Sequence, residues 1–325
     1  MSVPLTATRS LTIATATPPA GLQEATQRAG DFARAEKATS TKRDYRSDFA
    51  IFEAWATGQG ASALPAAPET VAAFIAAEAD RGAKASTIGR RLAAIRYAHK
   101  LAGLPLPTDD ERVRATARGI RRSIGTAKTK KAPATNDRLL AMVAPHGRSL
   151  AKLRDRALLL IGFAGAFRRS ELVALDLADI EETSEGLRIT IRQSKTDQEA
   201  EGQTIAIVRG SVACPVEALK AWLAAAGITG GPLFRPINKA DRVSPERLTA
   251  QSVALIVKAH CERAGLDPAQ FAGHSLRAGF LTSAAKRGAN LFKMMDVSRH
   301  RSVDTLRGYV RDAEIFKDHA GAGLL

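Results

Sequence analysis

One arginine stands directly after a strongly apolar segment of the chain. Residues 150–167 are apolar on nearly all sides, which predicts a buried central helix, and Arg168 follows within the motif RRSE. A buried guanidinium is costly unless an anion or a carboxylate receives it. Either an external anion or Glu171, three residues later, could therefore hold Arg168.

Five further side chains in the second half of the chain could bind anions or move protons. Lys195 stands at the base of a predicted hairpin. His274 and Arg277 lie three residues apart at a predicted helix start, so they face the same way. His300 lies in the helix break SRHRS, and Tyr309, one of three tyrosines, follows nine residues later. Lysine, histidine and tyrosine are residue types that serve as general acids, general bases or nucleophiles.

Each of these residue types, met alone, also has an ordinary structural explanation. An arginine can pair with a nearby carboxylate, and a single lysine is usually solvated. A histidine and an arginine at a helix start can form a cap and a salt bridge, and a single tyrosine most often packs in the core. A single shared site explains all of these residues at once. Without such a site, each residue would need its own separate structural explanation, so the shared site is favoured.

The ordered set resembles the active-site signature of tyrosine recombinases, the phage integrase family. The set is Arg168, Lys195, His274, Arg277, His300 and Tyr309. The surrounding motifs are similar as well: FRRSEL around the first arginine, GHSLRAGF around the HxxR box, and RHRSVDTLRGYV at the tyrosine. The resemblance is nearest to the simple Cre-like and Xer-like recombinases and covers roughly residues 35–325.

This resemblance implies a covalent mechanism without a metal or a nucleotide. Tyr309 would attack a DNA phosphodiester to give a 3′-phosphotyrosine, which conserves bond energy for rejoining. Arg168 and Arg277 would bind two phosphate oxygens, with His300 as a further donor. Lys195 would be the general acid for the leaving 5′-oxygen. No cofactor and no metal ion are expected, because the sequence has neither a two-metal carboxylate cluster nor a GxxxxGK[ST] loop.

His274 and Glu171 complete the expected site. His274 would assist deprotonation of Tyr309 or orient the phosphate, and Glu171 would position its neighbours. Arg299 is a departure, because many relatives have glycine immediately before the last histidine. We expect Arg299 to perturb the local turn while leaving His300 in register.

Composition favours a nucleic-acid partner. The 325 residues include 48 Lys and Arg against 33 Asp and Glu, a formal net charge of +15. An acidic membrane surface is the weaker alternative, and no apolar run approaches the roughly 18 residues of a membrane span. Cys214 and Cys261 form no CxxC pattern, so a disulfide framework and a cysteine zinc site are both disfavoured, which fits a cytoplasmic, DNA-associated protein.

Basic and small polar residues on two predicted helices and a linker are candidates for DNA contacts. The two helices would lie in adjacent major grooves, whereas the linker lysines would follow the phosphate backbone. The alternative for the helices is a solvated basic face. The candidates are Thr41, Lys42, Arg43, Arg46, Ser86, Thr87, Arg90, Arg91, Lys128, Lys130 and Lys131.

Hydrophobic periodicity predicts a mainly helical chain with one small sheet. In the first half it predicts helices over 40–57, 68–82, 86–102 and 108–123. In the second half, strands over 187–191 and 204–208, with a possible third over 179–183, follow the buried helix. Further helices are predicted over 215–225, 249–264, 274–287, 291–297 and from 303 to 309 or beyond.

These elements group into an expected domain order. A flexible arm over 1–30 precedes a helical, SAM-like core-binding domain over 31–124, and a basic linker spans 125–135. A mixed α/β catalytic domain with a three-stranded antiparallel sheet and a tail would occupy 136–325. The family resemblance implies that the two domains form a clamp around DNA. The arm is too short and irregular for an additional arm-binding domain.

The resulting functional hypothesis is site-specific DNA recombination through a Holliday junction. Double-stranded DNA with short inverted-repeat core sites would bind a dimer at each site and a tetramer in the synapse. The tail 316–325 would dock on a neighbouring protomer or on its own domain. One alternative function is type IB topoisomerase-like relaxation, and the other is sequence-specific binding by a catalytically silent protein.

Overall fold

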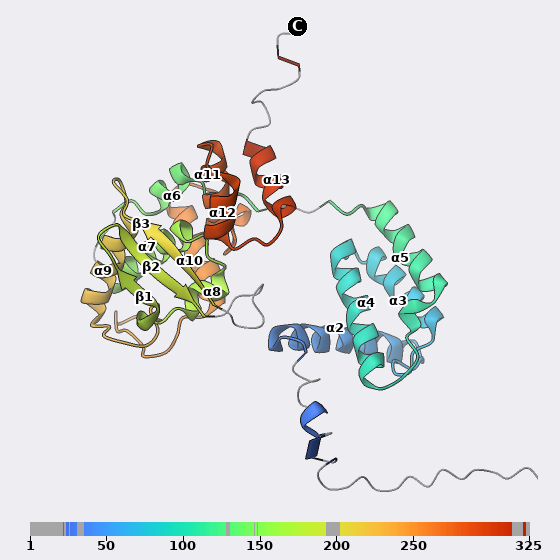
Figure 1. The fold of residues 1–325 in the computed structure, drawn as a ribbon. Helices are drawn as coiled ribbons and strands as arrows, with labels where there is room; N and C mark the ends of the chain where they lie inside the picture. Colours follow the sequence, from blue (N-terminus) through green and yellow to red (C-terminus); the bar gives the residue numbers. More distant parts are fainter. Residues whose placement is uncertain are drawn as a thin grey trace, which may run out of the picture. The chain divides into compact units, whose positions relative to one another are not determined.

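The computed structural model describes residues 22, 24–25, 27–30, 36–127, 131–145, 147, 149–192, 202–313 and 321–322. The described part of 22–30 is helical, whereas the rest of the expected arm lies outside this range, as do Lys128, Lys130 and Lys195. Nearly all of the expected tail 316–325 is likewise outside it. The chain divides into two compact units, 1–128 and 129–325 (Figure 1).

The N-terminal unit is a helical bundle. Its elements are α2 (Thr39–Gly58), α3 (Pro68–Asp80), α4 (Ala85–Leu101), the 3-10 turn η1 (Pro107–Asp109) and α5 (Glu111–Ile124). These helices confirm the four predicted in this half of the chain.

Local sequence explains where these helices begin and what they bury. Pro68 occupies the first turn of α3, where its missing N–H costs nothing, and Asp110 caps α5 by accepting from the Arg112 backbone N–H. The predicted aromatic face of α2 places Phe52 in the core, edge-on to Phe74 with ring centroids 5.1 Å apart. The bundle therefore forms because each helix contributes an apolar stripe.

The C-terminal unit combines helices with one sheet. Its elements are α6 (Asn136–Met142), α7 (Leu150–Ala164), α8 (Arg169–Ala174), η2 (Leu177–Asp179), β1 (Ile180–Glu182), β2 (Gly186–Ile191), β3 (Gln203–Val208), α9 (Pro215–Ala226), α10 (Ala250–Arg263), η3 (Pro268–Gln270), α11 (Ser275–Lys286), α12 (Leu291–Ser298) and α13 (Val303–Ala313). In Figure 1 the last three helices gather beside one another, and α11 packs against both α12 and α13.

The sheet is antiparallel in the order β1-β2-β3. Ile189 pairs with Ile180 on one side and with Ile205 on the other. Leu187, Ile189 and Ile191 are buried whereas the residues between them are exposed, which confirms the predicted alternation. The third strand is confirmed as well, so the expected fold class holds.

The buried helix α7 runs through the core of this unit. Leu158, Leu159 and Ile161 are fully buried, as the apolar run predicted. The helix ends at Ala164 rather than at Phe167, because Gly165 and Ala166 turn the chain and Ala166 takes a positive φ of 45°. This turn places Arg168 at the N-cap of the next helix.

The segment before α6 fixes the position of α11. Ala134 donates its backbone N–H to the Ser275 carbonyl at 2.9 Å, and the Asn136 N–H donates to Ser283 Oγ at 2.9 Å. Such close approach depends on Gly279, because a Cβ there would lie 1.9 Å from the Ala134 carbonyl oxygen. The packing therefore also fixes the position of Arg277, which lies in α11.

We therefore expect Gly279→Ala to destabilise the C-terminal unit by about 3 kcal/mol, since the obstacle is backbone that cannot rotate away. Chemical denaturation followed by tryptophan fluorescence measures this. Gly119→Ala, at an open helical position, is the matched control and should be neutral or slightly stabilising. Equal stability of the two variants would contradict the close-approach argument.

Candidate active site

Arg168 caps the start of α8 and faces a buried carboxylate. Its Nη1 donates to Glu171 Oε1 at 2.5 Å, and its backbone N–H donates to Oε2 at 3.0 Å. The Arg168 side chain is 14% exposed and that of Glu171 only 2%. Glu171, one of the two partners considered for Arg168 in the sequence, is therefore bonded to it.

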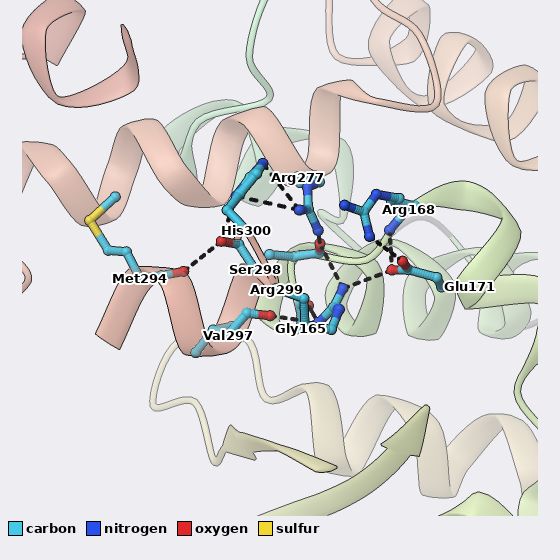
Figure 2. A network of polar contacts seen from close by, with 10 residues as sticks. Gly165, Arg168, Glu171, Arg277, Met294, Val297, Ser298, Arg299 and His300 are labelled. Atoms are coloured by element: carbon cyan, nitrogen blue, oxygen red, sulfur yellow. Dashed lines mark hydrogen bonds and ion pairs between the residues drawn. The ribbon is translucent and has the colours of Figure 1, made fainter. Parts of the chain in front are cut away.

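Glu171 also receives a second arginine. Arg299 Nη2 donates to Glu171 Oε2 at 2.8 Å, and both side chains are 2% exposed. Burial alone would raise the pKa of Glu171, but the Arg299 charge and the Arg168 hydrogen bonds outweigh it and hold the pKa below its usual range. Glu171 is thus an ionised carboxylate shared by two guanidinium groups (Figure 2).

Arg277 approaches the same region from α11. It is 1% exposed, and its Nη1 donates to the Ala166 carbonyl at 2.7 Å. Burial lowers the pKa of Arg277 to about 9, and the neighbouring charges of Arg168 and Arg299 act in the same direction. The two arginines predicted to bind phosphate are therefore attached to adjacent points of one turn between α7 and α8.

His300 follows the end of α12 and contacts Arg277. Arg277 Nη2 lies 3.2 Å from His300 Nε2, while Ser298 Oγ lies 2.8 Å from Nδ1. Ser298 Oγ also donates to the Met294 carbonyl at 2.6 Å, so we assign the Nδ1 proton to a hydrogen bond toward Ser298. That tautomer leaves the Nε2 lone pair facing the donor-only arginine.

The remaining predicted catalytic residues are distributed as follows. His274 is exposed at the residue before α11, one turn ahead of Arg277. Tyr309 lies in α13, partly buried in the small apolar cluster that includes Leu306. The charge interaction with Tyr309 acts to raise the pKa of Arg277, so the two side chains are neighbours. Lys195 falls in the connection from β2 to β3, outside the described residues.

Arg299 has contacts that the sequence did not reveal. It ends α12 in a left-handed conformation with φ 58°, and its Nη1 donates to the carbonyls of Gly165 at 3.0 Å and Val297 at 2.5 Å. Its Nη2 lies 3.2 Å from the Ala166 carbonyl oxygen, and its guanidinium lies 5.1 Å from the Phe167 ring centroid. Only the glycine usual at this position hinted that the turn is special.

The candidate DNA contacts on α2 are accessible. The Arg43 side chain is 79% exposed, beside Asp44 at 3.6 Å. Arg46 is exposed, and Thr41 and Lys42 are half-buried. These residues remain available to a ligand on one helix of the N-terminal unit.

The candidates on α4 are placed differently from one another. Ser86 is exposed and Thr87 half-buried. Arg90 forms a two-pronged ion pair with buried Asp48 through bonds of 2.5 and 3.0 Å, and its side chain stays 53% exposed. Arg91 is only 14% exposed and pairs with buried Glu78. Hence Arg90 can still present donors to solvent, whereas Arg91 is tied into the bundle.

Two further sets of basic residues concern DNA binding. Lys131 donates to the Ala269 carbonyl at 2.7 Å, which fixes it to the C-terminal unit. The α5 residues Arg121 and Arg122 are exposed and were not predicted as contacts, although their RR doublet in the sequence could have suggested it. They enlarge the cationic surface of the N-terminal unit.

Comparison with known proteins identifies the relatives of this chain. The family described as "Phage integrase family" matches residues 134–314, and "Phage integrase, N-terminal SAM-like domain" matches residues 32–103. An integrase/recombinase XerD homologue of Selenomonas ruminantium is 42% identical over 290 residues, covering 87% of this chain and 85% of the relative.

The chain belongs to the phage integrase family. Recombinase Cre of Escherichia phage P1 is 24% identical and is covered over 80% of both chains. A lambda integrase tetramer solved on a Holliday junction has a similar fold, with a TM-score of 0.60 at 17% identity, covering 92% of this chain and 79% of the integrase. The expected kinship with Xer-like and Cre-like proteins is confirmed, and the chain is a site-specific tyrosine recombinase.

The electrostatics of the integrase site predict a neutral His300 in the free protein. Burial lowers the pKa of His300 to about 4, helped by the charges of Arg277, Arg168, Arg299 and His274. Because the pKa is depressed, the ring carries no charge above about pH 5. A bound phosphate would oppose these cations and raise the pKa.

NMR titration of ring-labelled histidines tests this, with His300→Gln to assign the signal. We expect a midpoint near 4 without DNA and a higher one with inorganic vanadate, which mimics a pentacoordinate phosphate. A midpoint near 6.5 in the free protein would contradict the assigned environment.

Proposed function

We propose that this recombinase cleaves and rejoins DNA at short inverted-repeat core sites through a 3′-phosphotyrosine on Tyr309. The observation that carries the assignment is the joint network of Arg168, Arg277 and His300, which come from three separate elements. Two guanidinium groups, with a histidine that can become a donor on protonation, suit the several oxygens of a phosphate.

The two arginines supply the electrostatic part of catalysis. Arg168 uses one N–H for Glu171, and Arg277 uses one for the Ala166 carbonyl and one for His300. Each guanidinium has five N–H donors, so both retain further donors for phosphate oxygens. Negative charge grows on these oxygens when the phosphorus becomes pentacoordinate. Fixed guanidinium groups stabilise this charge without having to reorganise.

Proton transfers complete the reaction in both directions. Tyr309 attacks phosphorus, the bond to the 5′-oxygen breaks, and Lys195 donates a proton to that oxygen. His274 receives the phenol proton or orients the phosphate, and His300 donates to a phosphate oxygen after proton uptake or a change of tautomer. Rejoining reverses these steps, with the 5′-hydroxyl attacking the phosphotyrosine.

Domain roles and assembly follow from the same proposal. Residues 31–124 would bind DNA as the core-binding domain, the lysines of the linker 125–135 would contact the phosphate backbone, and 136–325 would hold the chemistry. A dimer at each site and a tetramer in the synapse would exchange strands through a Holliday junction. The lambda integrase tetramer on such a junction supports this arrangement.

Localisation is proposed from the partner. An enzyme that recombines DNA in bacteria or their phages would reside in the cytoplasm with the nucleoid. No helix within the described ranges has the length and apolar character to cross a membrane.

Tyr309→Phe should abolish the covalent adduct without weakening DNA binding, because it removes only the attacking oxygen. The wild type and the variant are incubated with nicked duplexes drawn from DNA flanking the gene, and SDS-resistant adducts are resolved by gel. Mobility shift is the control. A persisting adduct in Tyr309→Phe would exclude this tyrosine as nucleophile, and relaxation of any plasmid by monomers would favour topoisomerase-like activity.

Two arginines of the N-terminal unit should respond differently to removal. Arg46→Ala should weaken DNA binding and reduce the slope of log K against log salt by about 0.9, since one phosphate contact is lost. Arg91→Ala should instead lower the stability of this unit by about 2 kcal/mol, because buried Glu78 would keep only its exposed partner Arg81. Fluorescence anisotropy and denaturant titration measure the two effects, and identical behaviour of the variants would contradict the distinction.

A further inference from the structure

We propose that Arg299 is a positioning residue that leaves N–H groups of Arg168 unpaired for the scissile phosphate and fixes the backbone anchor of Arg277. The inference rests on the proposed roles of those two arginines. Arg299 itself is buried beneath them, so it acts through the acceptors that it shares with each (Figure 2).

The first shared acceptor is the Glu171 carboxylate. Its Oε2 receives Arg299 Nη2 at 2.8 Å and the Arg168 backbone N–H at 3.0 Å. Only Oε1 bonds the Arg168 side chain, through Nη1 at 2.5 Å. If Arg299 were absent, Oε2 could take a second N–H of the Arg168 guanidinium and form a two-pronged ion pair. Arg299 therefore prevents Glu171 from occupying the donors that the phosphate needs.

The second shared acceptor is the Ala166 carbonyl. It receives Arg277 Nη1 at 2.7 Å and Arg299 Nη2 at 3.2 Å, which uses both lone pairs of the oxygen. Arg299 Nη1 also holds the preceding carbonyl, that of Gly165, at 3.0 Å. Two consecutive carbonyls of the turn are thus fixed by one side chain, and the anchor of Arg277 is fixed with them.

The backbone at Arg299 would be less strained with glycine, so the arginine side chain is kept there in spite of its backbone conformation. A φ of 58° disfavours a residue with a Cβ, and glycine would adopt it freely. A buried guanidinium also carries a desolvation cost, which here is offset by Glu171, by carbonyls and by the Phe167 ring at 5.1 Å. Backbone strain and a buried charge at one residue are expected where that charge positions neighbouring groups.

Arg299→Gly is the central test, because glycine keeps the turn and removes only the side chain. We expect single-turnover cleavage of a nicked duplex that forms the wild-type adduct to fall about 100-fold, while the affinity for that duplex stays within twofold. Arg287→Ala removes an exposed charge at the end of α11 and is the matched control, with a wild-type cleavage rate expected. A wild-type rate in Arg299→Gly would overturn the proposal.

A second substitution separates positioning from simple structural support. The double variant Arg299→Gly with Glu171→Gln should cleave at least tenfold faster than Arg299→Gly alone. An amide has one oxygen, so it cannot accept two N–H groups of Arg168 on separate oxygens. If Arg299 only supported the fold, the double variant would be no faster than Arg299→Gly. Absence of rescue therefore overturns the positioning role.

Two further variants make every outcome decisive. If Arg299→Gly does not fold, as judged by circular dichroism, Arg299→Lys replaces it; a single ammonium cannot span Glu171 and both carbonyls, so we expect about tenfold slower cleavage, and an unchanged rate would refute the proposal. Arg168→Ala reports on the proposed function. Normal cleavage in Arg168→Ala would refute the active site, whereas lost cleavage there with a normal rate in Arg299→Gly would refute only the role of Arg299.

Discussion

The catalytic unit depends on how buried positive charge is balanced around the turn at Ala166. Three guanidinium groups converge there, and Glu171 is the carboxylate that neutralises two of them. Backbone carbonyls satisfy most of the remaining donors, and the arginines come from α8, α11 and the end of α12. Since an unpaired buried charge costs several kcal/mol, these elements hold their relative positions only while the shared acceptors stay in place. Fold and site are therefore one electrostatic arrangement.

Buried carboxylates also pair with arginines in the N-terminal unit, and there they determine which arginines stay exposed. Buried Asp48 and Glu78 receive Arg90 and Arg91 of α4, so carboxylates inside the bundle decide which arginines remain free for a ligand. The Arg91 guanidinium is buried by this pairing, whereas the Arg90 side chain stays about half exposed. The count of basic residues on a helix is thus a poor guide to its contacts, because internal partners first remove some of them. Exposed arginines such as Arg43 and Arg46 are therefore better candidates for DNA contacts than Arg91.

Much of this molecule could be predicted because its signals are local. Alternation at Leu187, Ile189 and Ile191 marked a half-buried strand, and the apolar run of α7 marked a buried helix. The short helices α6 and α8 were missed, since seven and six residues show too little periodicity. Arg299 was noticed only as a departure from glycine. Its partner Glu171 lies 128 residues away, so no spacing within the sequence could connect them.

The lowered pKa values of Arg277 and His300 reflect burial and an excess of positive charge in the free site. Each group is buried among cations, which disfavours its charged form until an anion enters. In the proposed reaction a phosphodiester would supply that anion and would thereby favour protonation of His300. The same logic applies more strongly to the pentacoordinate phosphorus, which carries more negative charge than the ground state. The clustered cations repel one another in the free protein, and added negative charge relieves this repulsion. They therefore stabilise the more negative transition state more than the ground state, which lowers the barrier.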